Sequence, residues 1–338
     1  MDRGTLADFA LLAVLALVAA LLSMLLVPVV RRLAVARGAI DVPDARRVLV
    51  KPTPRLGGVA IFVAFVVVIG AGAAVGRVSL TTSPPDMAAF LVAAFLVLAI
   101  GAIDDFRRQR PAVKLAVEIV AALIVVYLGH CRVVGISMPG GNALSLGTLA
   151  APLTVLWIVF VTNAVNLIDG IDGLAAGTSA IALVTVAVIA RGFGFPTVAA
   201  CAATLVGACA GFLVFNLHPA SIFLGDAGSL FLGFSIAVLA TYARAKESTG
   251  AITIGTLLIV ALPVGDTLFA IRRRYFAGLS VASPRSHLAG LSRVLRPDNN
   301  HIHHRLLRVG LGQRAAAWAL YGIQAAACGY AIYLLVKR

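Results

Sequence analysis

One segment of the chain, TNAVNLIDGIDGLAAG, carries a polar side chain at every third position: Asn163, Asn166, Asp169 and Asp172. If a helix continues through the segment, this spacing lines the four side chains along one face. Polar capping of a helix end would explain a single aspartate. Four aligned polar groups in a strongly apolar region are costly unless they bind something, so they indicate a site.

Two adjacent carboxylates, Asp104 and Asp105, stand in the segment GAIDDFRRQRPAVKL, which ends near Lys114. Two like charges about 4 Å apart repel by about 4 kcal/mol at an effective dielectric constant near 20, and a bound cation would relieve that repulsion. A solvated pair among the neighbouring arginines is the alternative. Those arginines are Arg107, Arg108 and Arg110.

A third acidic group, Asp226, lies in the segment FNLHPASIFLGDAGSLFLG, just before a long apolar stretch. An aspartate at the start of a helix is also an ordinary cap. The accompanying Asn216, His218 and Phe223 could hold a planar ring by amide hydrogen bonds and stacking, which suits a nucleobase.

Histidines gather in the segment RPDNNHIHHRLL, which contains His301, His303, His304 and Arg305. Zinc is one candidate ligand, but zinc favours cysteine and histidine together, and this segment has no cysteine. Phosphate binding by His and Arg donors is the other candidate. Because the remaining polar groups are carboxylates and amides, phosphate with Mg²⁺ fits the whole set better.

Two further cations, Lys51 and Arg55, belong to the stiff phrase RVLVKPTPRLGG. Basic residues flanking a membrane span are expected from topology alone. The two prolines nevertheless hold these cations in place, as a diphosphate site would require.

The elements that position these residues are predicted to be membrane helices. Of the 338 residues, 61% are hydrophobic and only 12% are charged, which indicates an all-α polytopic integral membrane protein with a single domain covering 1–338. Apolar runs long enough to cross a hydrocarbon layer of about 30 Å recur along the whole chain. We predict ten spans, near 8–30, 57–75, 87–103, 112–128, 149–167, 174–190, 196–215, 228–243, 251–271 and 315–336.

The basic residues predict how these spans are oriented. Most of the 28 lysines and arginines fall in alternate connections, which places those connections in the cytoplasm and both termini outside. Alternation around a Pro-Gly-Gly-Asn turn predicts a small outer β-hairpin near 132–148, and the longest cytoplasmic loop is expected near 272–314. Topology and attraction to anionic lipid explain the net charge of +14 without a nucleic-acid partner. Within the fourth span, Glu118 is expected to pair with Lys114.

Together, the five segments resemble the polyprenyl-phosphate N-acetylhexosamine-1-phosphate transferases of glycosyltransferase family 4. These are inner-membrane enzymes that begin cell-envelope glycan synthesis and include the phospho-MurNAc-pentapeptide translocase. The resemblance runs from KPTPRLGG to HIHHRLL. It implies transfer of a sugar-1-phosphate from a UDP-sugar to an undecaprenyl-type phosphate at the cytoplasmic face, with Mg²⁺ or Mn²⁺ as cofactor and UMP as product. A homodimer is left open.

The resemblance also implies roles for single residues. Asp226 and Asn166 would hold the metal, Asp104 and Asp105 would lie at the reaction centre, and Lys114 would lie near phosphate. The remaining residues would bind the nucleotide or the sugar and its diphosphate; they are Lys51, Asn163, Asp169, Asp172, Asn216, Phe223, His301, His303, His304 and Arg305.

Several alternatives stay open at the level of sequence. Ile302 interrupts the histidine run that is continuous in the translocase branch, so the phrase is similar to the branch that uses UDP-GlcNAc or a related UDP-HexNAc, including donors for O-antigen. UDP-MurNAc-pentapeptide is a further candidate donor. Two different classes are an ion-coupled transporter, against which the one-sided acids and the lack of a repeat argue, and a non-catalytic protein that binds nucleotide sugars.

Overall fold

The structure is a computed structural model that describes residues 3–41, 52–78, 84–137, 143–243, 254–279 and 301–336. Helices dominate these ranges, and eight of the described helices are long and apolar enough to cross a membrane. The chain is therefore an all-α polytopic membrane protein. Its helices are α1 (Arg3–Ala36), α2 (Gly57–Ala74), α3 (Pro84–Phe106), α4 (Pro111–Tyr127), α5 (Ala150–Ile168), α6 (Leu174–Gly192), α7 (Pro196–Asn216), α8 (Gly225–Tyr242), α9 (Ile254–Ile259), α10 (Ala261–Leu279), α12 (Ile302–Arg308) and α13 (Gln313–Val336).

Helix α8 forms the centre of the bundle. It packs against α3, α5, α2 and α6, and every residue from Ala227 to Tyr242 is buried. Phe231 contacts Phe62 and Phe65 of α2, and Phe234 stacks on Phe90 of α3 with ring centroids 6.4 Å apart. The outer helices instead expose leucine and valine along their length, as α1 does at Leu17 and Leu25. This distribution suits a bundle surrounded by lipid.

A close approach of α3 to the start of α8 brings the two acidic segments together. A Cβ atom at Gly101 would lie 2.5 Å from the main-chain oxygen of Asp226. Only glycine permits this approach, because any side chain would overlap the backbone of α8. Asp104 and Asp105 follow Gly101 by about one turn, so the same contact carries them to the start of α8.

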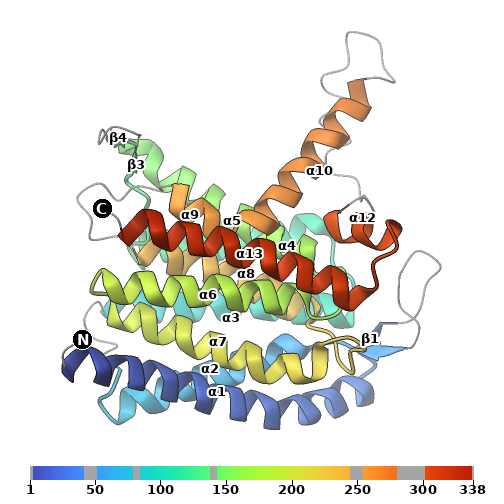
Figure 1. Ribbon diagram of the computed structural model, residues 1–338, viewed down its shortest axis with the longest axis horizontal. Coiled ribbons are helices and arrows are strands. Elements are labelled where there is room, and N and C mark those ends of the chain that lie inside the picture. Colours follow the sequence, from blue (N-terminus) through green and yellow to red (C-terminus); the bar gives the residue numbers. More distant parts are fainter. Residues whose placement is uncertain are drawn as a thin grey trace.

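The predicted ninth span, 251–271, is wrong as a single helix. In the described part of this range the chain forms α9 and then, after Val260, α10, which projects away from the bundle (Figure 1). Pro263 lies in the first turn of α10, where a missing N–H is tolerated. The buried side chain of Gln324 in α13 hydrogen-bonds to the backbone at this break. Its Nε2 donates to the Ile259 oxygen at 2.6 Å, and its Oε1 accepts from the Leu262 nitrogen at 3.2 Å.

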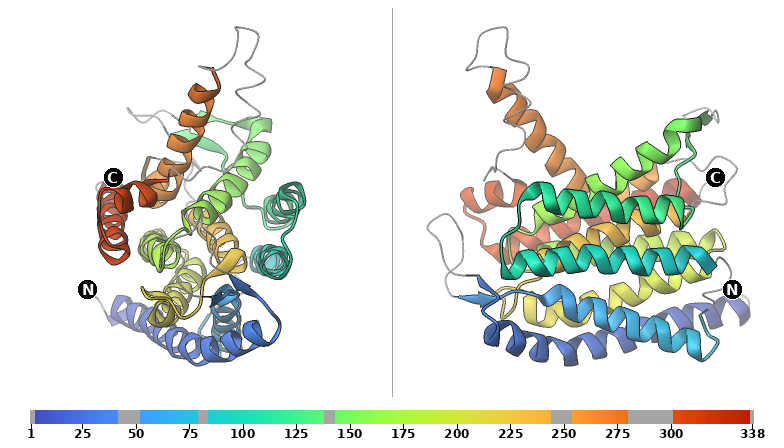
Figure 2. Two further views of the ribbon diagram at one scale, coloured as in Figure 1. Left: turned by 90° about the vertical axis from the view of Figure 1, so that its right-hand side faces the viewer. Right: turned by 180° about the vertical axis from the view of Figure 1, so that it is seen from behind.

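The two ends of the bundle differ in structure. At one end lie the beginning of α1, the end of α13 and the predicted hairpin, whose strands β3 (Gly135–Ser137) and β4 (Ala143–Ser145) pair antiparallel (Figures 1 and 2). The turn of this hairpin lies outside the described residues. At the other end lie α12 and the antiparallel pair β1 (Ile40–Asp41) and β2 (Thr53–Pro54). The termini thus share one end, and their predicted location outside the cell stays a prediction.

The described parts of the large loop predicted near 272–314 contain more helix than expected. Residues 272–279 continue helix α10, and Ile302–Arg308 form helix α12. The arginines at 272–274 led to the prediction of a loop there, but α10 continues past its apolar part into this basic segment.

Candidate active site at one end of the bundle

Lys114 joins the acidic groups of two helices. From the first turn of α4, its Nζ atom lies 2.6 Å from Oδ2 of Asp226 and 3.3 Å from Oδ2 of Asp104. Asn166 lies beside the Asp226 carboxylate, and its Nδ2 donates to Ser229 Oγ of the same helix as Asp226 at 2.9 Å. Four helices, α3, α4, α5 and α8, therefore bring carboxylate, amide and ammonium groups to one point.

The two adjacent aspartates have different partners. Asp105 accepts hydrogen bonds from the main-chain nitrogens of Asp226 at 3.0 Å and of Ala227 at 3.1 Å, so it caps α8 from another helix. A carboxylate there also interacts favourably with the positive end of the helix dipole. Asp104 accepts from the Gln109 nitrogen at 2.6 Å and keeps its second oxygen toward Lys114. Asp104 is thus the member of the pair that faces the cluster.

The polar stripe predicted from Asn163 to Asp172 does not continue along one helix. Helix α5 ends at Ile168, so Asp169 and Asp172 lie in the following loop. Burial, followed by the nearby carboxylates of Asp226 and Asp105, raises the pKa of Asp169 to about 8. Asp169 therefore belongs electrostatically to the cluster around Asp226, although the helix does not continue through the segment.

Two loops carry most of the residues predicted to bind the nucleotide. Asp172 Oδ2 lies 2.7 Å from Nδ1 of His218 and accepts from the Ala220 nitrogen at 3.1 Å. Asn216 accepts from the Gly173 nitrogen at 3.1 Å and donates to the Ile222 oxygen at 2.9 Å. These bonds hold the loop after α5 against the loop after α7. Contact of Asp172 and Asn216 with a nucleotide stays a prediction, and both residues clearly support the loops.

The segment around Phe223 lies against the KPTPRLGG phrase. The Phe223 nitrogen donates to the Pro54 oxygen at 2.8 Å, and the Phe223 oxygen accepts from the Gly57 nitrogen at 3.0 Å. The ring is half-buried. Arg55 forms an ion pair with Asp41, with 2.7 Å between Nη2 and Oδ2, so one of the two predicted diphosphate cations already has a partner. Lys51, the other, lies outside the described residues.

The histidine segment packs onto the loop after α5. His303 is only 1% exposed, and a Cβ atom at Gly170 would lie 2.1 Å from its Nε2. Neither ring nitrogen of His303 has a hydrogen-bond partner in the described part of the chain. The ring of His304 lies 4.3 Å away, and Arg305 is exposed. His303 therefore lies against the loop that carries Asp169, with His301 and His304 beside it.

Asp266 of α10 is a partner of the histidines that the sequence did not single out. Its carboxylate lies 2.7 Å from Nδ1 of His301 and accepts from the Ile302 nitrogen at 2.8 Å. In the sequence it is one of several aspartates near the predicted cytoplasmic face, at the end of a predicted apolar span.

Asn163 has a different partner from the other members of its motif. Its Nδ2 donates to the carboxylate of Glu118 and, at 2.9 Å, to the Val159 oxygen. The predicted pairing of Glu118 with Lys114 is wrong, because Lys114 turns toward Asp104 and Asp226.

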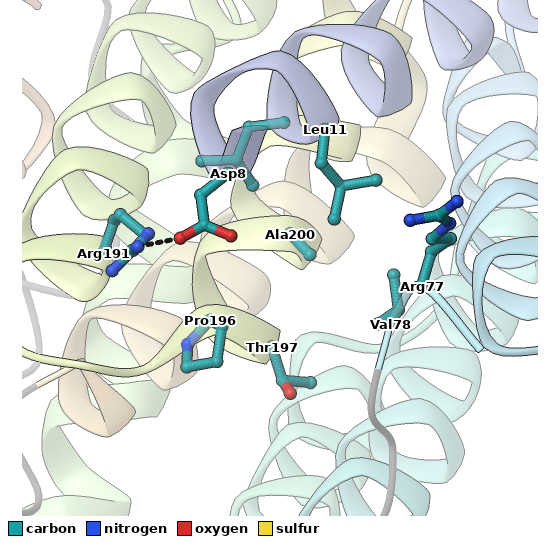
Figure 3. Close-up of a pocket in the computed structure, with 9 residues that line it drawn as sticks. Asp8, Leu11, Arg77, Val78, Arg191, Pro196, Thr197 and Ala200 are labelled. Atoms are coloured by element: carbon teal, nitrogen blue, oxygen red, sulfur yellow. Dashed lines mark hydrogen bonds and ion pairs between the residues drawn. The ribbon is translucent and has the colours of Figure 1, made fainter. Parts of the chain in front are cut away.

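A cavity at the opposite end contains none of the predicted site residues. Asp8 and Arg191 form an ion pair on one side of it, and Arg77 and Thr197 also line it (Figure 3). The convergent carboxylates, amides and histidines thus stand apart from this cavity, which is lined from the beginnings of α1 and α7 and the end of α6.

The donor groups at the cluster fit a hard cation. Asp226 and Asp104 offer carboxylate oxygens and Asn166 an amide oxygen, the ligand types that Mg²⁺ prefers. Among the described residues no three acidic, histidine or cysteine side chains are arranged to hold a metal by themselves. Mg²⁺ usually binds one or two carboxylates together with water and substrate phosphates, so the present groups suffice only with a phosphorylated substrate.

The fold and the cluster together define a class of protein: a polytopic membrane enzyme with a polar site at one end of its helix bundle. A family model described as glycosyl transferase family 4 matches residues 87–244, which include Asp104, Asp105, Lys114 and Asp226.

Curated relatives extend this match to most of the chain. A probable undecaprenyl-phosphate N-acetylglucosaminyl 1-phosphate transferase of Bacillus subtilis (strain 168) is 38% identical over 310 residues, 91% of this chain and 81% of that relative. A decaprenyl-phosphate N-acetylglucosaminephosphotransferase of Mycolicibacterium smegmatis is 34% identical over 95% of this chain and 81% of its own length. A phospho-N-acetylmuramoyl-pentapeptide-transferase of Shouchella clausii is 32% identical over 86% of each chain. The protein belongs to glycosyl transferase family 4 and is a transferase.

Proposed function

We propose that the protein transfers N-acetylglucosamine-1-phosphate from UDP-GlcNAc to a polyprenyl phosphate of the undecaprenyl type, and releases UMP. The observation that carries this proposal is the position of Lys114 between Asp104 and Asp226, at the point where four helices meet. Reaction between two phosphorylated substrates needs fixed positive charge beside groups that can place a nucleophile. The proposed site lies at the cytoplasmic face of the inner membrane, where it begins synthesis of a cell-envelope glycan.

The choice of donor rests on similarity. Two relatives that match 91% and 95% of this chain are named as N-acetylglucosamine-1-phosphate or N-acetylglucosamine phosphate transferases. The pentapeptide-transferase of Shouchella clausii covers less of this chain. The interrupted histidine run of this chain also favours UDP-GlcNAc over UDP-MurNAc-pentapeptide, and another UDP-HexNAc is the second candidate.

We propose direct displacement. An oxygen of the lipid phosphate attacks the β-phosphorus of the donor, the bond between that phosphorus and the bridging oxygen breaks, and UMP leaves with the bridging oxygen. Asp104 is better placed than Asp105 to accept or direct a proton of the lipid phosphate, because its Oδ2 faces Lys114 at 3.3 Å, whereas both oxygens of Asp105 are turned to the backbone of α8. Lys114 attracts and orients the phosphates.

The proposed metal sits next to the same cluster. Asp226 and Asn166 would hold Mg²⁺, or Mn²⁺ in its place, and the bound cation would offset negative charge on the transferring phosphate. The uridine is proposed to lie against Phe223 and the two loops that Asp172 and Asn216 join, with Asn163 and Asp169 on the side of α5. The sugar and diphosphate are proposed to lie toward His301, His303, His304 and Arg305, and Lys51 would add a further cation.

Turnover of the purified protein in detergent tests the proposal. With UDP-GlcNAc, a polyprenyl phosphate and Mg²⁺, we expect UMP to appear, and we expect chelation with EDTA or the substitution Asp226→Ala to abolish it. Asp8→Ala, which removes an acidic group at the opposite end, should retain turnover. Turnover with a different UDP-HexNAc alone would correct the donor. If folded protein releases UMP from no UDP-HexNAc, the proposal is wrong.

A single-turnover experiment without lipid acceptor separates the two chemical routes. Direct displacement predicts no UMP until the lipid phosphate is added. Release of UMP in an amount equal to the enzyme would indicate a phospho-enzyme and would overturn the direct route.

A further inference from the structure

Asp266 connects the projecting helix α10 with the histidine segment. Asp266 and His301 are 8% and 6% exposed, and their side chains approach to 2.7 Å between Oδ2 and Nδ1. The second carboxylate oxygen accepts from the main-chain nitrogen of Ile302 at 2.8 Å. Both oxygens of one buried carboxylate therefore bind adjacent residues of the histidine segment, His301 and Ile302.

The first bond fixes which nitrogen of His301 carries hydrogen. An ionised carboxylate can only accept, so Nδ1 of His301 must be the donor. In the described part of the chain Nε2 of His301 makes no hydrogen bond. Asp266 therefore leaves Nε2 of His301 available to a ligand.

The second bond, from the Ile302 nitrogen to Asp266, helps to fix the position of the His301 ring. Ile302 begins α12, and acceptance of its N–H by Asp266 satisfies one of the donors at the start of that helix. The rings of His301 and His303 are then nearly parallel, 5.8 Å apart, and His303 packs on Gly170. Among the described residues, the titratable groups seen against the His301 ring are Asp266 from α10 and His303 from α12.

We propose that Asp266 is a positioning residue of the active site, which accepts a hydrogen bond from Nδ1 of His301 and so directs Nε2, carrying a hydrogen of its own in the donor complex, toward a phosphate oxygen of the donor's diphosphate. This inference rests on the proposed function for the identity of the anion. It assigns a defined role to a residue outside the acidic cluster and 35 residues distant from the histidine it orients.

The substitution Asp266→Asn separates orientation from simple helix capping. The asparagine oxygen can still accept from Ile302, while its amide can donate to Nδ1 of His301. The fold and the cap are thereby retained, but the negative charge is lost and the hydrogen of His301 moves to Nε2. A comparable exchange of carboxylate for amide beside a catalytic histidine yields the wrong tautomer in serine proteases, which is an established example.

Two measurements on the full chain in detergent test the proposal. Imidazole ¹⁵N NMR, with the His301 signals assigned from His301→Gln, should show Nδ1–H in the unaltered protein and Nε2–H in Asp266→Asn. Calorimetric titration with UDP-GlcNAc should show binding at least about tenfold weaker in Asp266→Asn, as expected for loss of a charge-assisted hydrogen bond. Asp266→Glu should recover part of the affinity, and His301→Gln should add little to the loss in Asp266→Asn.

The matched control is Thr267→Val, the adjacent residue of α10, whose buried hydroxyl has no hydrogen-bond partner in the described residues. It should bind UDP-GlcNAc like the unaltered protein. Equal binding by Asp266→Asn and the unaltered protein, or an unchanged tautomer, would reduce Asp266 to a helix cap and overturn the proposal. If the unaltered protein does not bind UDP-GlcNAc, the proposed function and the diphosphate contact both fail, while the tautomer comparison still decides the positioning role.

Discussion

Lys114 offers the clearest test of the cluster at the scale of single residues. Its ammonium forms an ion pair with both Asp104 and Asp226. Replacing it with methionine leaves those carboxylates without compensation and removes a cation from the phosphates. We expect Lys114→Met to lower kcat by about 10²–10³, the usual effect of losing one group that stabilises transition-state charge.

The comparison for this prediction is Arg108→Ala, which removes an exposed positive charge from the connection between α3 and α4. Steady-state UMP release should be nearly unchanged in Arg108→Ala and partly retained in Lys114→Arg. A Lys114→Met protein with ordinary kcat would show that the ion pairs are structural.

His303 predicts how stability depends on pH. Burial, with a smaller effect of His304 and His301, lowers the pKa of His303 to about 4, against an ordinary value of 6.5. Below pH 6.5 the unfolded chain binds a proton that the folded protein excludes until about pH 4. The contribution of His303 to stability is therefore complete above pH 6.5 and falls as pH decreases, by about 2 kcal/mol between pH 7 and pH 5.

Reversible denaturation with SDS at pH 7 and pH 5 measures this difference. His303→Gln should lose about 2 kcal/mol of the pH dependence, whereas His130→Gln, an exposed histidine at the opposite end, should retain all of it. The same pH dependence in His303→Gln and the unaltered protein would contradict the prediction.

Residue types and spacing predicted a set of site residues but not which partner each side chain contacts. Nothing in the pair Asp104–Asp105 indicates that one carboxylate caps α8 while the other faces Lys114, since the distinction depends on how α3 meets α8. The contact of Asp266 with His301 could not be predicted for the same reason. The two residues are distant in sequence, and only the folded chain brings them together.

At the scale of elements, the packing of α12 on the loop after α5 depends on Gly170. A methyl group there would overlap the His303 ring, with 2.1 Å between the added Cβ and Nε2. We expect Gly170→Ala to displace α12 or the loop and to weaken UDP-GlcNAc binding about tenfold, which calorimetric titration would measure. The magnitude corresponds to about 1.4 kcal/mol.

A second substitution makes this prediction specific. His303→Ala in the Gly170→Ala protein removes the overlapping ring, so the double variant should bind better than the sum of the two single losses predicts. Gly322→Ala, at a helical glycine with open space around it, is the matched control and should bind normally. Additive losses would show that the contact between Gly170 and His303 does not matter for binding.

The break between α9 and α10 depends on Gln324. Within a membrane protein, unpaired backbone groups are costly, and this buried amide satisfies one carbonyl and one N–H at the break. Gln324→Leu should lower the free energy of unfolding by about 2 kcal/mol or more, since each buried group left without a partner costs about 1–3 kcal/mol. SDS denaturation measures this change, with the exposed neighbour Ile323→Leu as control. A fully stable Gln324→Leu protein would mean that water satisfies the break.

Hydropathy predicted helix locations well and helix continuity poorly. The spans near 57–75 and 196–215 agree closely with α2 and α7, because a long apolar run in lipid has few alternatives to a helix. The range 251–271 is equally apolar, yet it contains a break. The break in this range depends on Pro263 and on hydrogen bonds from Gln324 of α13. A hydropathy average over the range detects neither.

At the scale of the whole molecule, the sequence predicted an acidic site at one end but not the order of helices around it. Lys114 and Asp226 are 112 positions apart, and their contact requires α3, α4 and α8 to pack as neighbours. The apolar sequence could not predict that arrangement, because lipid-facing and helix-facing leucines look alike. Close contacts such as that of Gly101 with α8 decide it, and they are visible only in the folded bundle.

The orientation of the whole bundle yields the last prediction. Arg31, Arg108, Arg272 and Arg314 lie at the same end as the acidic cluster, as expected for a cytoplasmic end, whereas His130 lies at the other. The four native cysteines are buried, so they should react poorly with a charged maleimide. His130→Cys should therefore be labelled in intact cells, and Arg108→Cys only in inverted membrane vesicles. Because UDP-sugars are made in the cytoplasm, labelling of Arg108→Cys in intact cells would place the cluster on the wrong side for its proposed donor.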